Sequence, residues 1–179
     1  MLCVGAAAGF EVGSKLEDFQ LKDASGAIRS MESYSGKILV FVFWSFKCPV
    51  SLAYDDRVEK LQAKYAGKGV VVLGVASGAN DNADETRANA ANLKIQFPIL
   101  LDTDGDLVEK LGATHTPDVF ILDRAAVLRY KGALDNNKKP GESGRIAYAD
   151  DAIDAILAGR AAPVSETRPF GCSIKRRTQ

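Results

Sequence analysis

Three cysteines are the residues of this chain best suited to chemistry. They are Cys3, Cys48 and Cys172, in a sequence of 179 residues with one histidine, His115. A zinc site built from Cys and His would use nearly all four, and their spacing matches no zinc-ligand pattern. A histidine-dependent triad would have only His115 available. No metal or cofactor is therefore predicted, and a cysteine thiolate is the first candidate nucleophile.

Cys48 lies at a predicted junction between a strand and a helix. Residues 38–44 form a continuous apolar run that is typical of a strand buried on both faces. Pro49 directly follows Cys48, and proline is favoured at the first position of a helix. The free amides and partial positive charge at a helix N-terminus stabilise a thiolate, so this placement predicts a lowered pKa for Cys48. A buried structural cysteine is the alternative interpretation.

The elements around Cys48 alternate between strand and helix. Beyond the strand at 38–44, the sequence predicts helix 50–66, strand 70–76, helix 80–94, a short helix from 104 to 111 capped by Asp104, strands 119–122 and 127–131, and helix 148–157. A β-α-β unit requires a parallel sheet covered by helices, while the last two strands form a hairpin. On the predicted helix 50–66, Asp55, Asp56 and Arg57 are expected to form a solvated face.

A resemblance to a known fold rests on two segments. These are Phe43-Trp44-Ser45-Phe46-Lys47-Cys48-Pro49-Val50-Ser51 and the later Gly112–Asp123 stretch that contains Thr116-Pro117. Together with the element order they resemble the thioredoxin fold, and the second stretch is similar to the cis-proline region of redoxins. The resemblance covers about residues 12–160 and is greatest to redoxins of the AhpC/TSA (peroxiredoxin-like) and TlpA-like groups.

The resemblance implies a fold and a site. The expected fold is an α/β, thioredoxin-like three-layer sandwich with a central mixed sheet and helices on both faces. In the family the proline loop lies beside the reactive cysteine and helps to hold the partner chain. Carried onto this sequence, that makes Cys48 the nucleophile and Thr116 and Pro117 the residues that shape the partner groove.

Two departures from the family pattern bear on the chemistry. Thioredoxins and TlpA-like proteins carry C-x-x-C, but Ser51 stands at the second cysteine position, so local dithiol exchange is impossible. The Ser51 hydroxyl could instead bond the Cys48 thiolate or cap the helix. Peroxiredoxins carry P-x-x-x-T-x-x-C, whereas here Phe41 and Ser45 stand at the Pro and Thr positions. A complete peroxide site is therefore not predicted.

Cys172 lies in an extended segment after the last predicted helix. The Gly-Cys-Ser-Ile-Lys sequence around it resembles the C-terminal tail of the peroxiredoxin-like subgroup. By analogy with two-cysteine peroxiredoxins, Cys172 could resolve an oxidised Cys48, within one chain or between chains. Such a disulfide requires the two Cα atoms to come within about 7 Å. A free cysteine on a tail is the alternative, and His115 is a weaker candidate for a base or cation near Cys48.

Composition sets the remaining limits. The 23 basic and 23 acidic residues balance, so no nucleic-acid partner is indicated. No apolar run reaches the ~18 residues of a transmembrane helix.

We expect a flexible segment at 1–11, a redoxin domain at 12–160 and a tail at 161–179. The small residues near the N-terminus are compatible with export, but a cytoplasmic location is equally compatible.

The sequence leaves three functions open. The first is a thiol-dependent oxidoreductase that acts through Cys48 on protein thiols and disulfides or on peroxides, with an unidentified thiol reductant. The second is a peroxiredoxin-type peroxidase in which Ser45 replaces the family threonine. The third is a non-catalytic binding module with the redoxin fold.

Overall fold

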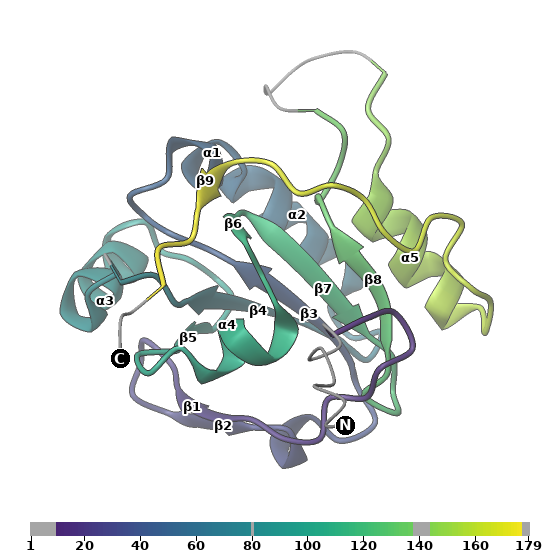
Figure 1. The fold of residues 1–179 in the computed structure, drawn as a ribbon, viewed down its shortest axis with the longest axis horizontal. Helices are drawn as coiled ribbons and strands as arrows, with labels where there is room; N and C mark the ends of the chain where they lie inside the picture. Colours follow the sequence, from purple (N-terminus) through teal and green to yellow (C-terminus); the bar gives the residue numbers. More distant parts are fainter. Residues whose placement is uncertain (1–9, 80, 138–143, 177–179) are drawn as a thin grey trace, which may run out of the picture.

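A five-stranded sheet forms the centre of the molecule. The computed structural model describes residues 10–79, 81–137 and 144–176 (Figure 1), so Cys3 and nearly all of segment 1–11 lie outside the described residues. The sheet order is β5-β4-β3-β7-β8. Its strands are β3 (Ile38–Phe43), β4 (Val70–Ala76), β5 (Ile99–Leu101), β7 (Asp118–Leu122) and β8 (Leu128–Gly132).

The sheet is mixed, as predicted. Strands β3, β4 and β5 pair in parallel, whereas β7 pairs antiparallel with both β3 and β8. All six residues of β3 are buried. A central strand covered on both faces needs apolar side chains at every position, which explains the unbroken run in the sequence.

Two apolar clusters lie on opposite faces of this sheet. On one face α1 (Pro49–Ala53), α2 (Asp55–Tyr65) and α5 (Tyr148–Leu157) contribute residues such as Tyr54, Leu61 and Ile153. On the other face α4 (Asp106–Leu111) packs with the segment that precedes the hairpin of β1 (Gln20–Lys22) and β2 (Ile28–Ser30). The remaining helices are α3 (Ala83–Asn92) and the 3-10 turn Glu32–Tyr34. The result is a three-layer sandwich.

The predicted helix 50–66 is interrupted. It forms α1 and α2, which meet at Tyr54. The Tyr54 ring is fully buried, and its hydroxyl donates a 2.8 Å hydrogen bond to Asp135. The side chains of α2 also differ from the expected solvated face, because Arg57 forms a 2.9 Å ion pair with the buried Asp135. These contacts come from a distant segment that helical spacing does not reveal.

The cap of α4 is also different from the prediction. Asp104 does not cap it, because the helix begins only after Gly105, which has a positive φ of 83°. The carboxylate of Asp102 takes this role and accepts hydrogen bonds from the amides of Leu107 and Val108, at 3.1 and 2.9 Å. The helix N-terminus is thus satisfied by a side chain from the end of β5.

The tail after α5 returns across the molecule and includes a short strand. Lys131 in β8 exchanges two backbone hydrogen bonds with it, to Ser165 and from Thr167. Further along, β9 (Cys172–Ser173) pairs antiparallel with β6 (His115–Thr116). Figure 1 shows the tail, coloured yellow, running from α5 past α1 and β6. In the described part of the chain, no helix combines the length and the hydropathy needed to cross a membrane.

Candidate active site

Cys48 is positioned by the turn between β3 and α1. After β3 ends at Phe43, the amide of Cys48 donates to the carbonyl of Ser45 at 3.1 Å. Cys48 is the N-cap residue of α1 and Pro49 occupies its first turn. The carbonyl of Cys48 accepts the first helical bond, from Leu52 at 3.1 Å. The strand-to-helix junction predicted from the sequence is therefore present.

The proline loop lies directly against Cys48. The Thr116–Pro117 peptide bond is cis. The carbonyl oxygen of Thr116 lies 3.0 Å from the Sγ atom of Cys48, at a distance where a thiol donates a hydrogen bond. Cys48 is 1% exposed, so its sulfur lies beneath this loop and the tail rather than on an open surface.

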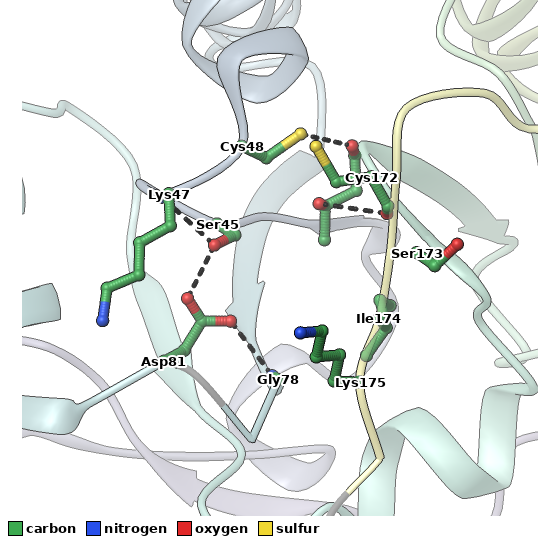
Figure 2. Close-up of a pocket in the computed structure, with 10 residues that line it drawn as sticks. Ser45, Lys47, Cys48, Gly78, Asp81, Cys172, Ser173, Ile174 and Lys175 are labelled. Carbon is green, nitrogen blue, oxygen red and sulfur yellow. Dashed lines mark hydrogen bonds between the residues drawn. The ribbon is translucent and has the colours of Figure 1, made fainter.

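Cys172 is delivered to the same place by the tail. In the β6–β9 pair, Thr116 and Cys172 are register partners. Figure 2 shows the two sulfur atoms near one another, and the side chain of Cys172 is among the groups that lower the pKa of Cys48. Both cysteines are free thiols, with Cys48 buried and Cys172 partly exposed. The structure therefore brings together the two cysteines that sequence reasoning paired by analogy.

The environment gives the two thiols different acidities. Burial acts most strongly on the Cys48 thiol and opposes ionisation. Its pKa is nevertheless lowered, because the side chains of Cys172 and Thr116 and the amides of Ser51 and Cys172 stabilise the thiolate. Burial and the neighbouring Cys48 sulfur raise the pKa of Cys172 to about 11. The pair thus favours a thiolate on Cys48 and a thiol on Cys172.

Gly171 permits this close approach. A Cβ atom at this position would lie 2.1 Å from the carbonyl oxygen of Thr116, and the φ of Gly171 is +135°. Only glycine combines this backbone conformation with the absence of a side chain. The glycine before Cys172 is therefore what allows the tail to lie against the proline loop.

A small cavity of about 160 Å³ opens beside the two sulfurs. Ser45, Cys48, Thr116 and Cys172 line it, together with Asp81 and Lys175. The Ser45 hydroxyl donates a 2.7 Å hydrogen bond to Asp81, and the Asp81 carboxylate also accepts from the Gly78 amide at 3.1 Å. Figure 2 shows this Ser45–Asp81 link on the side of the cavity away from Cys172.

Two residues singled out from the sequence lie outside this arrangement. Ser51 is fully buried, and its hydroxyl has no hydrogen-bond partner within the described residues, so it neither bonds the Cys48 sulfur nor caps α1. His115 bonds the Thr114 hydroxyl at 2.8 Å. Because neighbouring strand residues point to opposite sides, His115 points away from the cavity that Thr116 lines.

Sequence reasoning missed Asp81, Gly171 and Lys175. Asp81 follows the C-terminal end of β4, which is parallel to β3 and therefore ends at the same edge of the sheet as Cys48. That topological rule could have identified it. No local pattern indicated Gly171 or Lys175, because their positions depend on the fold of the tail. Among the described residues, no group of three or more His, Cys, Asp or Glu side chains could hold a metal ion.

Comparison with known proteins decides the family. The sequence model of the AhpC/TSA family matches residues 12–131. The chain belongs to the AhpC/TSA family. It is a redoxin with the thioredoxin-like fold, as the resemblance implied. The thioredoxin-like protein YneN of Bacillus subtilis is 31% identical over 121 residues, which are 68% of this chain and 71% of YneN.

Two further relatives extend the comparison. The thiol-disulfide oxidoreductase ResA of Bacillus thuringiensis is 25% identical over 64% of this chain, and the match spans 65% of the length of ResA. The crystal structure of the hypothetical protein SMc02350 of Sinorhizobium meliloti has a TM-score of 0.84 and 26% identity. That match covers 96% of this chain and 98% of the other, so SMc02350 shares the architecture well beyond residue 131.

Proposed function

We propose that this redoxin is a thiol-disulfide oxidoreductase in which Cys48 is the nucleophile and Cys172 of the same chain resolves the intermediate. The observation that carries the proposal is the pairing of β9 with β6, which sets Cys172 opposite Thr116 and beside the Cys48 sulfur. The name of the relative ResA agrees with this reaction class. Pro117 shapes the loop that contacts both Cys48 and the strand of Cys172.

The proposed reaction has two exchange steps. The Cys48 thiolate attacks one sulfur of a disulfide substrate, forms a mixed disulfide and expels the other sulfur as a thiolate, which takes a proton from solvent. Cys172 then loses its proton and attacks the Cys48 sulfur, which expels the second substrate thiolate. The products are a Cys48–Cys172 disulfide and two substrate thiols. A dithiol reductant restores the two cysteines.

Intact mass measurement tests this proposal. Treatment with excess disulfide followed by its removal should lower the mass by two hydrogens per chain, without a doubled mass. Cys48→Ser and Cys172→Ser should each abolish this loss, whereas Cys3→Ser, the matched control, should retain it. An unchanged mass in the wild-type chain, or a loss of two hydrogens that persists in Cys172→Ser, would contradict the proposal.

A peroxidase is less well supported by the site. The Ser45 hydroxyl, at the position of the family threonine, donates to Asp81, and Phe41 lies fully buried in β3. Loss of the Cys48 thiol with hydrogen peroxide at the rate of an ordinary thiol is the result expected here. A rate far above that would instead favour the peroxidase. A Cys48→Ser variant that keeps full cellular function would favour the binding module.

A further inference from the structure

The strand edge beside Cys48 is already occupied by the chain's own tail. Within the described residues, β6 has one paired strand, and that strand is β9. An unpaired strand edge presents backbone N–H and C=O groups that readily accept an extended peptide. In this molecule the backbone around Cys172 fills that position, with its thiol where the disulfide of a docked polypeptide would lie.

The tail is held on both sides of Cys172. Before it, the Phe170 ring packs edge-on against Tyr54 at 6.0 Å, and the Thr167 hydroxyl accepts a 2.9 Å hydrogen bond from the Ala133 amide. After it, Ile174 donates to Thr114 at 2.9 Å, and the carbonyl of Lys175 accepts from Ala79 at 2.8 Å. Displacing the strand therefore requires breaking contacts with four separate parts of the fold.

The opening that remains is small. Cys48 is 1% exposed, and the cavity beside it holds about 160 Å³. Pockets for drug-sized ligands are about 300–1,000 Å³. A polypeptide disulfide must bring backbone on both sides of its sulfurs, whereas a disulfide with short substituents needs only the cavity.

We propose that the substrate of Cys48 is a low-molecular-mass disulfide, and that the docked tail excludes polypeptide disulfides from the β6 edge. This inference rests on the proposed function, since it assigns a substrate class to the same nucleophile. It makes the tail both the resolving element and the element that selects the substrate by size.

The test measures the first exchange step alone. In a Cys172→Ser background the mixed disulfide on Cys48 cannot be resolved and accumulates as added mass. Two oxidants are compared, bis(2-hydroxyethyl) disulfide and insulin, and each rate is divided by that of a free small thiol with the same oxidant. We expect the normalised rate with the small disulfide to exceed that with insulin by about tenfold or more, a difference of about 1.4 kcal/mol or more.

Gly171→Ala in the same background should release the tail, because the added Cβ meets the Thr116 carbonyl. The ratio of the insulin rate to the small-disulfide rate should then rise about tenfold, because any change in the ionisation of Cys48 affects both rates alike. Gly159→Ala is the matched control, since Gly159 has a φ of +68° but nothing within 4 Å of its Cβ position. Phe170→Ala loosens the same tail without backbone strain and should act like Gly171→Ala.

The outcomes separate the two proposals. Equal normalised rates with insulin and the small disulfide in the Cys172→Ser variant overturn the inference and leave the proposed function intact. An unchanged ratio of the insulin rate to the small-disulfide rate in both Gly171→Ala and Phe170→Ala also overturns it. If neither the small disulfide nor insulin forms a mixed disulfide on Cys48, the proposed function is overturned, and the inference is overturned with it.

Discussion

Thr116 and Cys172 are partners in the β6–β9 pair, although 56 positions separate them in the sequence. The same Thr116 contributes the carbonyl oxygen that lies 3.0 Å from the Cys48 sulfur. One residue of the proline loop thus contacts both cysteines. Because the side chain and amide of Cys172 lower the pKa of Cys48, the position of the tail affects the ionisation of Cys48.

The first prediction concerns the acidity of Cys48. Because Cys172 and Thr116 stabilise its thiolate, the pKa of Cys48 is lowered despite burial. The rate of alkylation of Cys48 by iodoacetamide should therefore titrate with a midpoint below that of an unperturbed cysteine thiol. Cys172→Ala removes a donor and should move that midpoint upward.

The neighbouring Ser173→Ala change serves as the control for this measurement. Ser173 is an exposed residue of the same short strand. Its replacement should leave the midpoint of Cys48 alkylation where it is in the wild-type chain. The same midpoint in Cys172→Ala and wild type would show that Cys172 does not stabilise the thiolate.

The second prediction concerns reduction of the Cys48–Cys172 disulfide. A reductant thiol should attack Cys172, because Cys172 is partly exposed and Cys48 is buried. The expelled thiolate is then Cys48, whose lowered pKa makes it the better leaving group. Brief treatment with a monothiol, followed by alkylation and peptide mapping, should find the monothiol on Cys172 and the alkyl group on Cys48. The reverse distribution would refute this order of attack.

The third prediction concerns Asp118, which follows the cis-proline and is 3% exposed. Burial raises its pKa to about 7, although the amides of Thr114, His115 and Val119 and the charge of Lys131 act in the opposite direction. The unfolded chain has an Asp pKa of about 3.9. Between these values the folded state binds more protons, so the free energy of unfolding falls as pH rises from about 4 to about 7.

Asp118→Asn removes this penalty and leaves an oxygen that can accept from the Thr114 amide. We expect the variant to be more stable than wild type at pH 8 by about 1–3 kcal/mol, and the difference to vanish near pH 4. Urea unfolding at both pH values measures it. A variant that is destabilised equally at pH 4 and pH 8 would contradict the assignment.

The fourth prediction concerns the ion pair between Arg57 in α2 and the buried Asp135. Asp135 is fully buried and bonds Arg57 at 2.9 Å, Arg145 at 2.7 Å and the Tyr54 hydroxyl at 2.8 Å. Asp135→Ala leaves the mostly buried Arg57 without its carboxylate and should lower the free energy of unfolding by about 3–5 kcal/mol. Asp84→Ala, in an exposed pair with Arg87, should change it little. Similar free energies of unfolding for the two variants would argue against a stabilising role of the Asp135 ion pair.

Much of the fold follows from local sequence patterns. The apolar run of β3 is required by a strand buried on both faces, and Pro49 at the start of α1 fixes Cys48 as its N-cap. The break at Tyr54 and the capping of α4 by Asp102 were not predicted. In each case the deciding hydrogen bond joins the helix to a distant residue. Tyr54 bonds Asp135, and the amide of Leu107 bonds Asp102 at the end of β5, so helical spacing cannot predict either.

The sequence by itself determined the position of the candidate nucleophile, because the strand, the turn and the helix start that surround Cys48 are all encoded within about ten neighbouring residues. It also indicated Thr116-Pro117 as the loop beside that site. Only the tertiary structure decided where Cys172 lies. The β6–β9 pairing is made by backbone hydrogen bonds and by the clearance at Gly171, and neither depends on a side-chain pattern that periodicity can reveal. The sequence shows Cys172 only as part of a tail, whereas the β6–β9 pairing makes it the second cysteine of the candidate site.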